Sequence, residues 1–146
     1  MTIEDLKSYE RYWRANRSIE QRIMTLVAAE VSITPHGGDG SQHMGTHDPM
    51  TAVDQRLDYC ASRSEEYRKN LAYMRRVDEA IASISDPLER EILRLRYTDF
   101  RYGQQMTWPQ VRTALYGRTH ISNAGIYRLH DAAIQSFAAL RDFESV

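Results

Sequence analysis

The sequence predicts an all-α protein in which two long helices precede a helix–turn–helix domain. Three observations favour this class. Apolar residues recur at spacings of three and four, glycines and prolines gather between the helical segments, and no stretch shows the alternation of a β-strand. The chain has 146 residues, of which 42% are hydrophobic and 27% charged, values typical of an ordinary folded protein.

Residues 3–30 are predicted to form one helix, because no glycine or proline interrupts them and a stripe of residues repeats at helical spacing. This stripe contains Tyr9, Tyr12, Asn16, Ile19, Ile23 and Leu26. The residues that follow are rich in glycine and proline, with Pro35, Gly37, Gly38, Gly40, Gly45 and Pro49. We therefore expect a loop at about 32–49.

A second long helix is predicted from Pro49 to Ile84, where the spacing of three and four continues over several heptads. Its stripe contains Met50, Val53, Leu57, Cys60, Ser64, Tyr67, Leu71, Met74, Asp78 and Ile81. Helices of this length pair along a seam, so we expect an antiparallel hairpin or part of an oligomeric coiled coil. Polar seam residues, namely Asn16, Ser64 and Asp78, would fix the register at a cost in stability.

Three shorter helices are predicted in the rest of the chain, which we divide into domains 1–84 and 85–146. Asp86 and Pro87 begin helix 87–98, marked by Leu88, Ile92, Leu95 and Arg96, and residues 99–106 form a polar loop. A capping box from Thr107 to Gln110 begins helix 108–116, which stops at Gly117. Ser122 caps the last helix, whose apolar residues are Ile126, Leu129, Ala133, Ile134, Phe137 and Leu140.

Positive charge is concentrated in residues 90–130, although the whole chain has a net charge of −1. This segment holds seven arginines against Glu91 and Asp99, so its local charge is 7 − 2 = +5. Phosphate binding requires clustered positive charge rather than a basic chain as a whole. The segment is therefore a candidate nucleic-acid-binding region.

The two helices around Gly117 form a candidate helix–turn–helix, in which Trp108, Val111 and Leu115 brace the second helix. Side chains in the first turns of that second helix would read base edges, while helix N-termini and nearby arginines suit phosphate. The candidate DNA-binding residues are Thr107, Arg118, Ser122, Asn123, Ala124, Tyr127 and Arg128. We expect Arg128 to be exposed and Trp108 to be largely buried against the recognition helix.

Three segments of the second domain carry a family resemblance, namely ISDPLEREILRLRY (84–97), TWPQV (107–111) and IYRLHDAAI (126–134). They resemble phage-encoded transcriptional regulators related to ArpU and RinA, whose DNA-binding part is similar to the C-terminal promoter-reading region of sigma factors. The N-terminal half resembles this family too, in its long helix, its Gly-rich loop and the segments 48–50 and 53–58 that start the second long helix.

This resemblance implies control of phage late genes by binding to promoter DNA in the bacterial cytoplasm. It places the recognition contacts at Asn123, Ala124, Tyr127 and Arg128, with Thr107 and Trp108 opening the bracing helix. The expected partners are double-stranded DNA, host RNA polymerase and, because the long helices can pair between chains, a second copy of the chain. No cofactor is implied.

Two other functions fit the same pattern. A small DNA-packaging subunit, as in a terminase, also combines a helix–turn–helix with long helices, but its DNA-binding unit usually comes first, whereas here it comes last. A protein-only adaptor could bind RNA polymerase or a sigma factor without DNA. These alternatives would be separated by a large ring in solution and by polymerase binding without DNA affinity, respectively.

Enzymatic, metal-binding and membrane functions are not expected. His36, His43 and His47 lie in a Gly-broken segment without nearby cysteines, and Cys60 lies on a seam, where a thiol acts as a small apolar group. No Gly-rich phosphate cradle is present. The acidic N-terminus is unlike a signal peptide and no apolar run could cross a bilayer, so we expect a cytoplasmic protein without a membrane partner.

Overall fold

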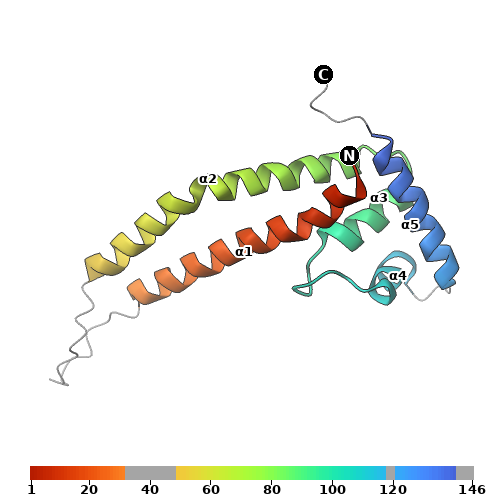
Figure 1. Cartoon of the computed structure of the whole chain (residues 1–146). Coiled ribbons are helices and arrows are strands. Elements are labelled where there is room, and N and C mark those ends of the chain that lie inside the picture. The colour runs from red at the N-terminus through yellow and green to blue at the C-terminus, as the bar shows by residue number, and fades with distance from the viewer. Residues whose placement is uncertain (32–48, 118–120, 141–146) are drawn as a thin grey trace. The chain divides into compact units, whose positions relative to one another are not determined.

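A computed structural model of the chain describes residues 1–31, 49–117 and 121–140. All regular structure in these ranges is helical and no strand occurs in them, which confirms the predicted all-α class. The elements are α1 (Ile3–Val31), α2 (Pro49–Ala82), α3 (Pro87–Leu93), η1 (Arg94–Thr98), α4 (Trp108–Tyr116) and α5 (Asn123–Ala138) (Figure 1). The predicted loop at 32–49 lies outside the described residues except at Pro49, where α2 begins.

The chain divides into two compact units. One consists of Met1–Trp13 together with Leu71–Val146, and the other of Arg14–Asn70. The chain passes from one unit to the other after Trp13 and after Asn70, whereas the predicted domain boundary lies after residue 84. Residues 1–13 and 71–84, which the sequence places in the first domain, share a unit with residues 85–146.

In the Arg14–Asn70 unit, α1 and α2 run antiparallel and are joined by polar side chains. The Tyr67 hydroxyl donates to Glu20 (2.7 Å), and Arg56 Nε donates to Glu30 (2.7 Å) nearer the other end. Asn16 is buried, as expected for a seam residue, but it pairs with the buried Asn70: Asn70 Nδ2 donates to Asn16 Oδ1 at 2.8 Å. Because an asparagine in a seam is satisfied only in one alignment of the helices, this pair specifies the register.

The predicted register of α2 is half right. Every seventh residue from Val53 to Ile81 is half-buried or buried, as expected, namely Val53, Cys60, Tyr67, Met74 and Ile81. The predicted residues between them are exposed, namely Leu57, Ser64, Leu71 and Asp78. The positions one residue earlier, such as Arg56, Asn70 and Val77, are covered instead. The reason is that Arg56 and Asn70 have polar partners on α1, so a polar pair occupies places where the sequence pattern favours leucine.

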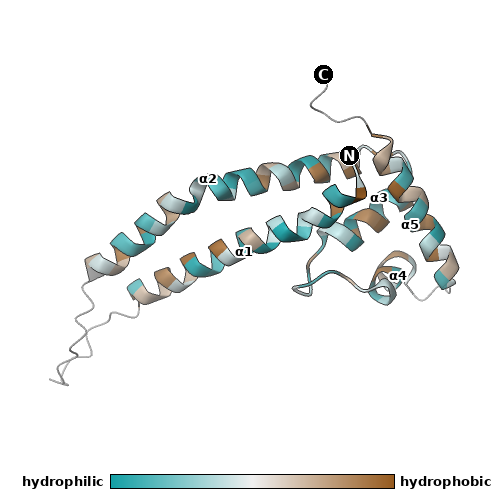
Figure 2. Ribbon diagram, in the orientation of Figure 1, coloured by the Kyte–Doolittle hydropathy of each residue, from teal (hydrophilic) through white to brown (hydrophobic). Residues whose placement is uncertain are grey.

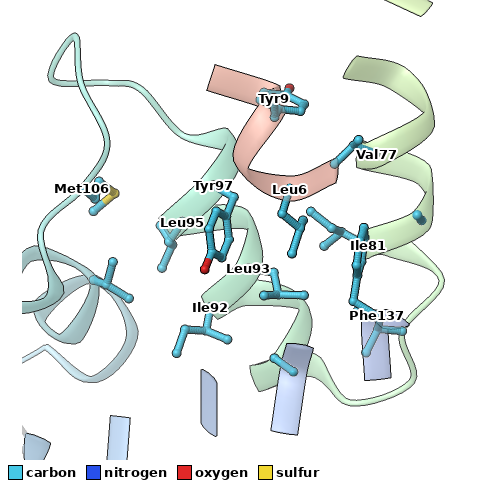
Figure 3. Close-up of a cluster of buried hydrophobic side chains, with 14 of the residues drawn as sticks. Leu6, Tyr9, Val77, Ile81, Ile92, Leu93, Leu95, Tyr97, Met106 and Phe137 are labelled. Atoms are coloured by element: carbon cyan, nitrogen blue, oxygen red, sulfur yellow. The ribbon is translucent and has the colours of Figure 1, made fainter. Parts of the chain in front are cut away.

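The other unit has one hydrophobic core, shown in Figure 3. Its completely buried residues come from five segments, and they include Leu6 of α1, Val77 of α2, Ile92 and Leu93 of α3, Val111 of α4, and Ala133 and Phe137 of α5. The Trp13 ring also stacks on Phe100, with ring centroids 4.6 Å apart. The first turns of α1 are therefore part of the core that supports α4 and α5.

The start of α3 follows the prediction. Asp86 is the N-cap, and its carboxylate accepts from the main-chain N–H groups of Leu88 (2.8 Å) and Glu89 (3.2 Å), while Pro87 occupies the first turn. The predicted helix 87–98 is present, but its last five residues form a π-helical turn, η1. Leu88, expected on the apolar face, is 44% exposed because it lies in the first turn.

Candidate nucleic-acid interface

α4 has the predicted boundaries, and both are set by local contacts. The Thr107 hydroxyl accepts from Gln110 N (3.3 Å) while Gln110 Oε1 accepts from Thr107 N (2.9 Å), which is a complete capping box. The helix ends at Gly117, whose φ of 59° lies in the left-handed region that favours glycine. Thr107 is exposed, and its hydroxyl is already used in capping the start of α4.

α5 begins at its predicted cap, because the Ser122 hydroxyl accepts from Gly125 N at 3.1 Å. The helix buries Ile126, Ala133 and Phe137 in the core of its unit. A Cβ at Gly125 would lie 3.0 Å from Ile121 Cγ1, so the absence of a side chain allows the chain before the helix to pack closely. The first turns of α5 are thereby held in a fixed position.

Four of the predicted DNA-binding residues lie together on the exposed side of these turns, namely Asn123, Ala124, Tyr127 and Arg128. They flank the buried Ile126 at the spacing expected for the outer side of a packed helix. Arg128 is exposed, as expected. Thr107 and Ser122 serve as helix caps, and Arg118 lies outside the described residues.

Trp108 connects the first turn of α4 to α5. Its ring meets Tyr127 and His130 edge-on, with centroid distances of 5.6 and 4.8 Å, and the Arg96 guanidinium lies over it at 4.4 Å. The expected contact with the second helix is therefore present. Trp108 is partly buried: its side chain packs against the hydrophobic core, and a guanidinium covers one face of the ring.

Arg96 has a structural role rather than a free charge. One of its terminal nitrogens donates to the Met106 carbonyl, and burial lowers the pKa of its guanidinium. Its Nε is buried and has no hydrogen-bond partner in the described part of the chain. Arg96 therefore braces Trp108 and the loop before α4, and it is not available to DNA.

Other arginines of the basic segment are also engaged within their unit. Arg90 donates to the Ile84 carbonyl at 2.7 Å. Arg94 and Arg101 both pair with Asp99, and the hydrogen bond from Arg101 is the main reason that the pKa of Asp99 is lowered. The predicted cluster of positive charge is thus mostly committed to local structure, which leaves Arg112 and Arg128 as the described arginines next to the start of α5.

Arg112 is a candidate site residue that the sequence analysis did not identify. Its Nη1 donates to Asn123 Oδ1 at 3.1 Å, across the turn between α4 and α5. This bond orients the Asn123 amide and uses one of the two lone pairs of its oxygen, so the oxygen can accept one further hydrogen bond and the NH₂ group remains a donor. Only the fold could reveal the pair, because the two residues are eleven apart and lie on different helices.

His130 lies two positions after Arg128 on α5, behind the exposed surface. Its Nε2 lies 2.7 Å from the Tyr97 hydroxyl, and burial lowers its pKa below the ordinary value of 6.5. Its neutral ring packs between Tyr97 and Trp108, so His130 links the buried core to the helix start.

Comparisons with protein-family models, with curated proteins and with solved structures found no match for this chain. Within residues 1–31, 49–117 and 121–140, no helix is both long and apolar enough to cross a membrane. The same residues hold no group of three or more His, Cys, Asp or Glu side chains that could bind a metal ion. The histidines considered as metal ligands, at 36, 43 and 47, lie outside the described residues.

Proposed function

We propose that the protein is a sequence-specific DNA-binding transcriptional regulator, in which α4 and α5 form a sigma-like helix–turn–helix and α5 enters the major groove. The observation that carries this proposal is the arrangement of the first two turns of α5. They expose Asn123, Ala124, Tyr127 and Arg128 while the other side of the helix is anchored in the core.

The exposed side chains have the chemistry of base readout. A guanidinium such as that of Arg128 pairs bidentately with guanine, and a small apolar residue such as Ala124 fits beside the thymine methyl group. Asn123 can pair bidentately with adenine while Arg112 holds it, because its oxygen keeps one lone pair and its NH₂ group is a donor. We therefore assign Arg128 as the principal base-reading residue, and the Arg112–Asn123 pair as a second contact.

The start of α5 also suits the DNA backbone. The first N–H groups of a helix and its dipole favour an anion, and Arg112 adds positive charge beside them. Such contacts position the protein without reading sequence. The combination of backbone and base contacts on one exposed helix start is what a promoter-binding protein requires.

The biological role proposed here is control of phage or prophage late genes, and it rests on the sequence resemblance described above. In this role the protein acts on promoter DNA in the cytoplasm of a bacterial host and works together with host RNA polymerase. DNA affinity that depends on Arg128 would distinguish this role from a protein-only adaptor, and the absence of a large ring in solution would distinguish it from a packaging subunit.

The test is to enrich duplexes that bind the full-length protein from a random pool and to measure their affinity by fluorescence anisotropy. Arg128→Ala should weaken binding by about 1–3 kcal/mol and relax preference at one base pair. If Arg128 contacts only phosphate, binding to all sequences weakens and the salt slope falls by about 1. Arg75→Ala is the matched control, since Arg75 is an exposed arginine of α2 in the same unit. Equal effects of both substitutions, or no enrichment, would contradict the proposal.

A further inference from the structure

The Arg14–Asn70 unit has a very small core for its length. In the part that the structure describes, its buried residues are Asn16, Ile19, Leu26 and Asn70. Two of these four are polar. Because a stable domain needs layers of structure that enclose an apolar interior, two helices with this seam are an incomplete arrangement.

The same unit exposes a set of large hydrophobic side chains. On α1 these are Met24 (67% exposed), Val27 (40%) and Val31 (71%), and on α2 they are Met50 (60%) and Leu57 (52%). Hydrophobic residues recur along α1 between hydrophilic ones in Figure 2. Exposed apolar side chains that gather on one side mark an interaction site more often than single exposed residues do.

These side chains share one side of the helix pair. On α1, Met24, Val27 and Val31 each follow a residue of the seam by one position, and on α2 Leu57 follows the seam residue Arg56 in the same way. One position rotates the side chain by 100° about the helix axis, in the same sense on both helices when each is viewed from its N-terminus. Since α1 and α2 are antiparallel here, equal rotations bring both sets to the same side.

The opposite side of the pair is polar. It contains the exposed residues that precede the seam by one position, including Arg22, Thr25, Gln55 and Lys69. Every exposed large hydrophobic residue in the described part of this unit is on the first side, which we name the apolar face. It is defined by Met24, Val27, Val31, Met50 and Leu57.

The two ends of the apolar face carry opposite charges. When two copies of the face pack antiparallel, the positive end of one copy meets the negative end of the other. Arg17, Glu20 and Arg68 follow seam residues at one end, where Asn16 meets Asn70; Arg17 lies 3.9 Å from the Glu20 carboxylate, so Arg68 gives this end its net positive charge. Asp54 follows the seam residue Val53 toward the other end, where Glu30 meets Arg56. Residues 54 and 68 are about 21 Å apart along α2. A two-fold axis across the face near Ala61 would place Arg68 against Asp54 of the partner subunit.

We propose that the chain forms a homodimer in which two apolar faces pack against each other, antiparallel, as a four-helix bundle. The bundle would enclose Met24, Val27 and Leu57 around the small Ala61, and a two-fold interface of this kind uses the same patch on both copies. A parallel arrangement would instead oppose arginine to arginine. The interface differs from the seam predicted from sequence and is independent of DNA binding.

The first experiment measures the mass of the full-length protein by sedimentation equilibrium, which should give twice the 17.0 kDa of one chain. Met24→Glu with Leu57→Glu should give a monomer. Thr25→Glu with Gln55→Glu adds the same two charges on the polar side and should remain a dimer. Circular dichroism of each variant establishes that helix content is kept. A wild-type monomer at millimolar concentration, or a dimer that survives the apolar-face substitutions, would overturn the proposal.

The second experiment tests the orientation with charge reversals, which leave the helix cores untouched. Asp54→Arg alone should raise the dimer dissociation constant roughly fivefold, because it opposes Arg68 of the partner subunit. Adding Arg68→Asp in the same chain should restore the affinity. If the single reversal has no effect, or if the double variant is no tighter than the single, the antiparallel arrangement is wrong.

Discussion

Leu6 lies near the start of the chain, yet we predict that it supports the proposed DNA-binding helices. Its side chain is completely buried in a core that also contains Ile92, Val111 and Phe137. Replacing a buried leucine by alanine costs about 2–5 kcal/mol, and the upper half of this range applies where the site is fully enclosed. Total stability is about 5–15 kcal/mol, so Leu6→Ala should remove a large part of it.

The assay is thermal and urea unfolding of the full-length protein, monitored by near-UV circular dichroism. Leu6→Ala should lower the melting temperature by about 10 °C or more, given about 3–5 °C per kcal/mol for a chain of this length. Leu88→Ala is the same substitution at a position that is 44% exposed in α3, and it should cost less than about 1 kcal/mol. Equal and small effects of both changes would refute the inclusion of residues 1–13 in this unit.

Two further predictions concern the aromatic cluster behind α5. Trp108→Ala should lower the free energy of unfolding by about 2–4 kcal/mol, somewhat less than for a fully buried tryptophan because its side chain is only partly buried; a loss of DNA binding with unchanged stability would contradict this structural role. Because burial lowers the pKa of His130, the unfolded chain binds protons that the folded chain does not. The stability due to neutral His130 should therefore be complete above pH 6.5 and decline as the pH falls below it. His130→Gln should flatten urea midpoints between pH 5 and 8, which span the ordinary histidine range, and an unchanged slope would show that His130 is not responsible.

The helix ends were predictable from sequence because their causes are local. Asp86, Thr107 and Ser122 each cap a helix through a hydrogen bond to a residue two or three positions away, and Gly117 ends α4 with a positive φ. The spacing of apolar residues also indicated which side of α5 is buried. Such features need no knowledge of the rest of the fold.

The register of α2 was only partly predictable, because the seam is not made of apolar residues alone. A spacing argument prefers Leu57 and Leu71 to Arg56 and Asn70, yet the polar residues are covered because Glu30 and Asn16 satisfy them. Their partners are 26 and 54 residues away in sequence. Nothing local to α2 reveals such pairing.

The division of the chain into units and the fate of the charge cluster also depend on contacts that local sequence does not show. Apart from Tyr9, the other members of the core that Leu6 joins are about 70 or more positions away, so no shift in composition marks the boundary between the units. The arginines around 90–101 look like a basic patch in sequence, but Asp99 and main-chain carbonyls engage them in the fold. Arg112 is a candidate site residue because it donates to Asn123, and this contact exists only because the turn between α4 and α5 brings the two residues together.

The most direct test of the proposed function is photocrosslinking of the full-length protein to an enriched duplex. A photoreactive aromatic residue would replace Tyr127, which is 48% exposed in the second turn of α5. The matched position is Leu88, which is similarly exposed but lies near the other end of α5, where the Ser136 hydroxyl donates to Glu89 at 2.7 Å. We predict a crosslink to bases from position 127 and none from position 88. Crosslinking from 88 alone, or from neither position while the duplex remains bound, would contradict the assignment of α5 as the recognition helix.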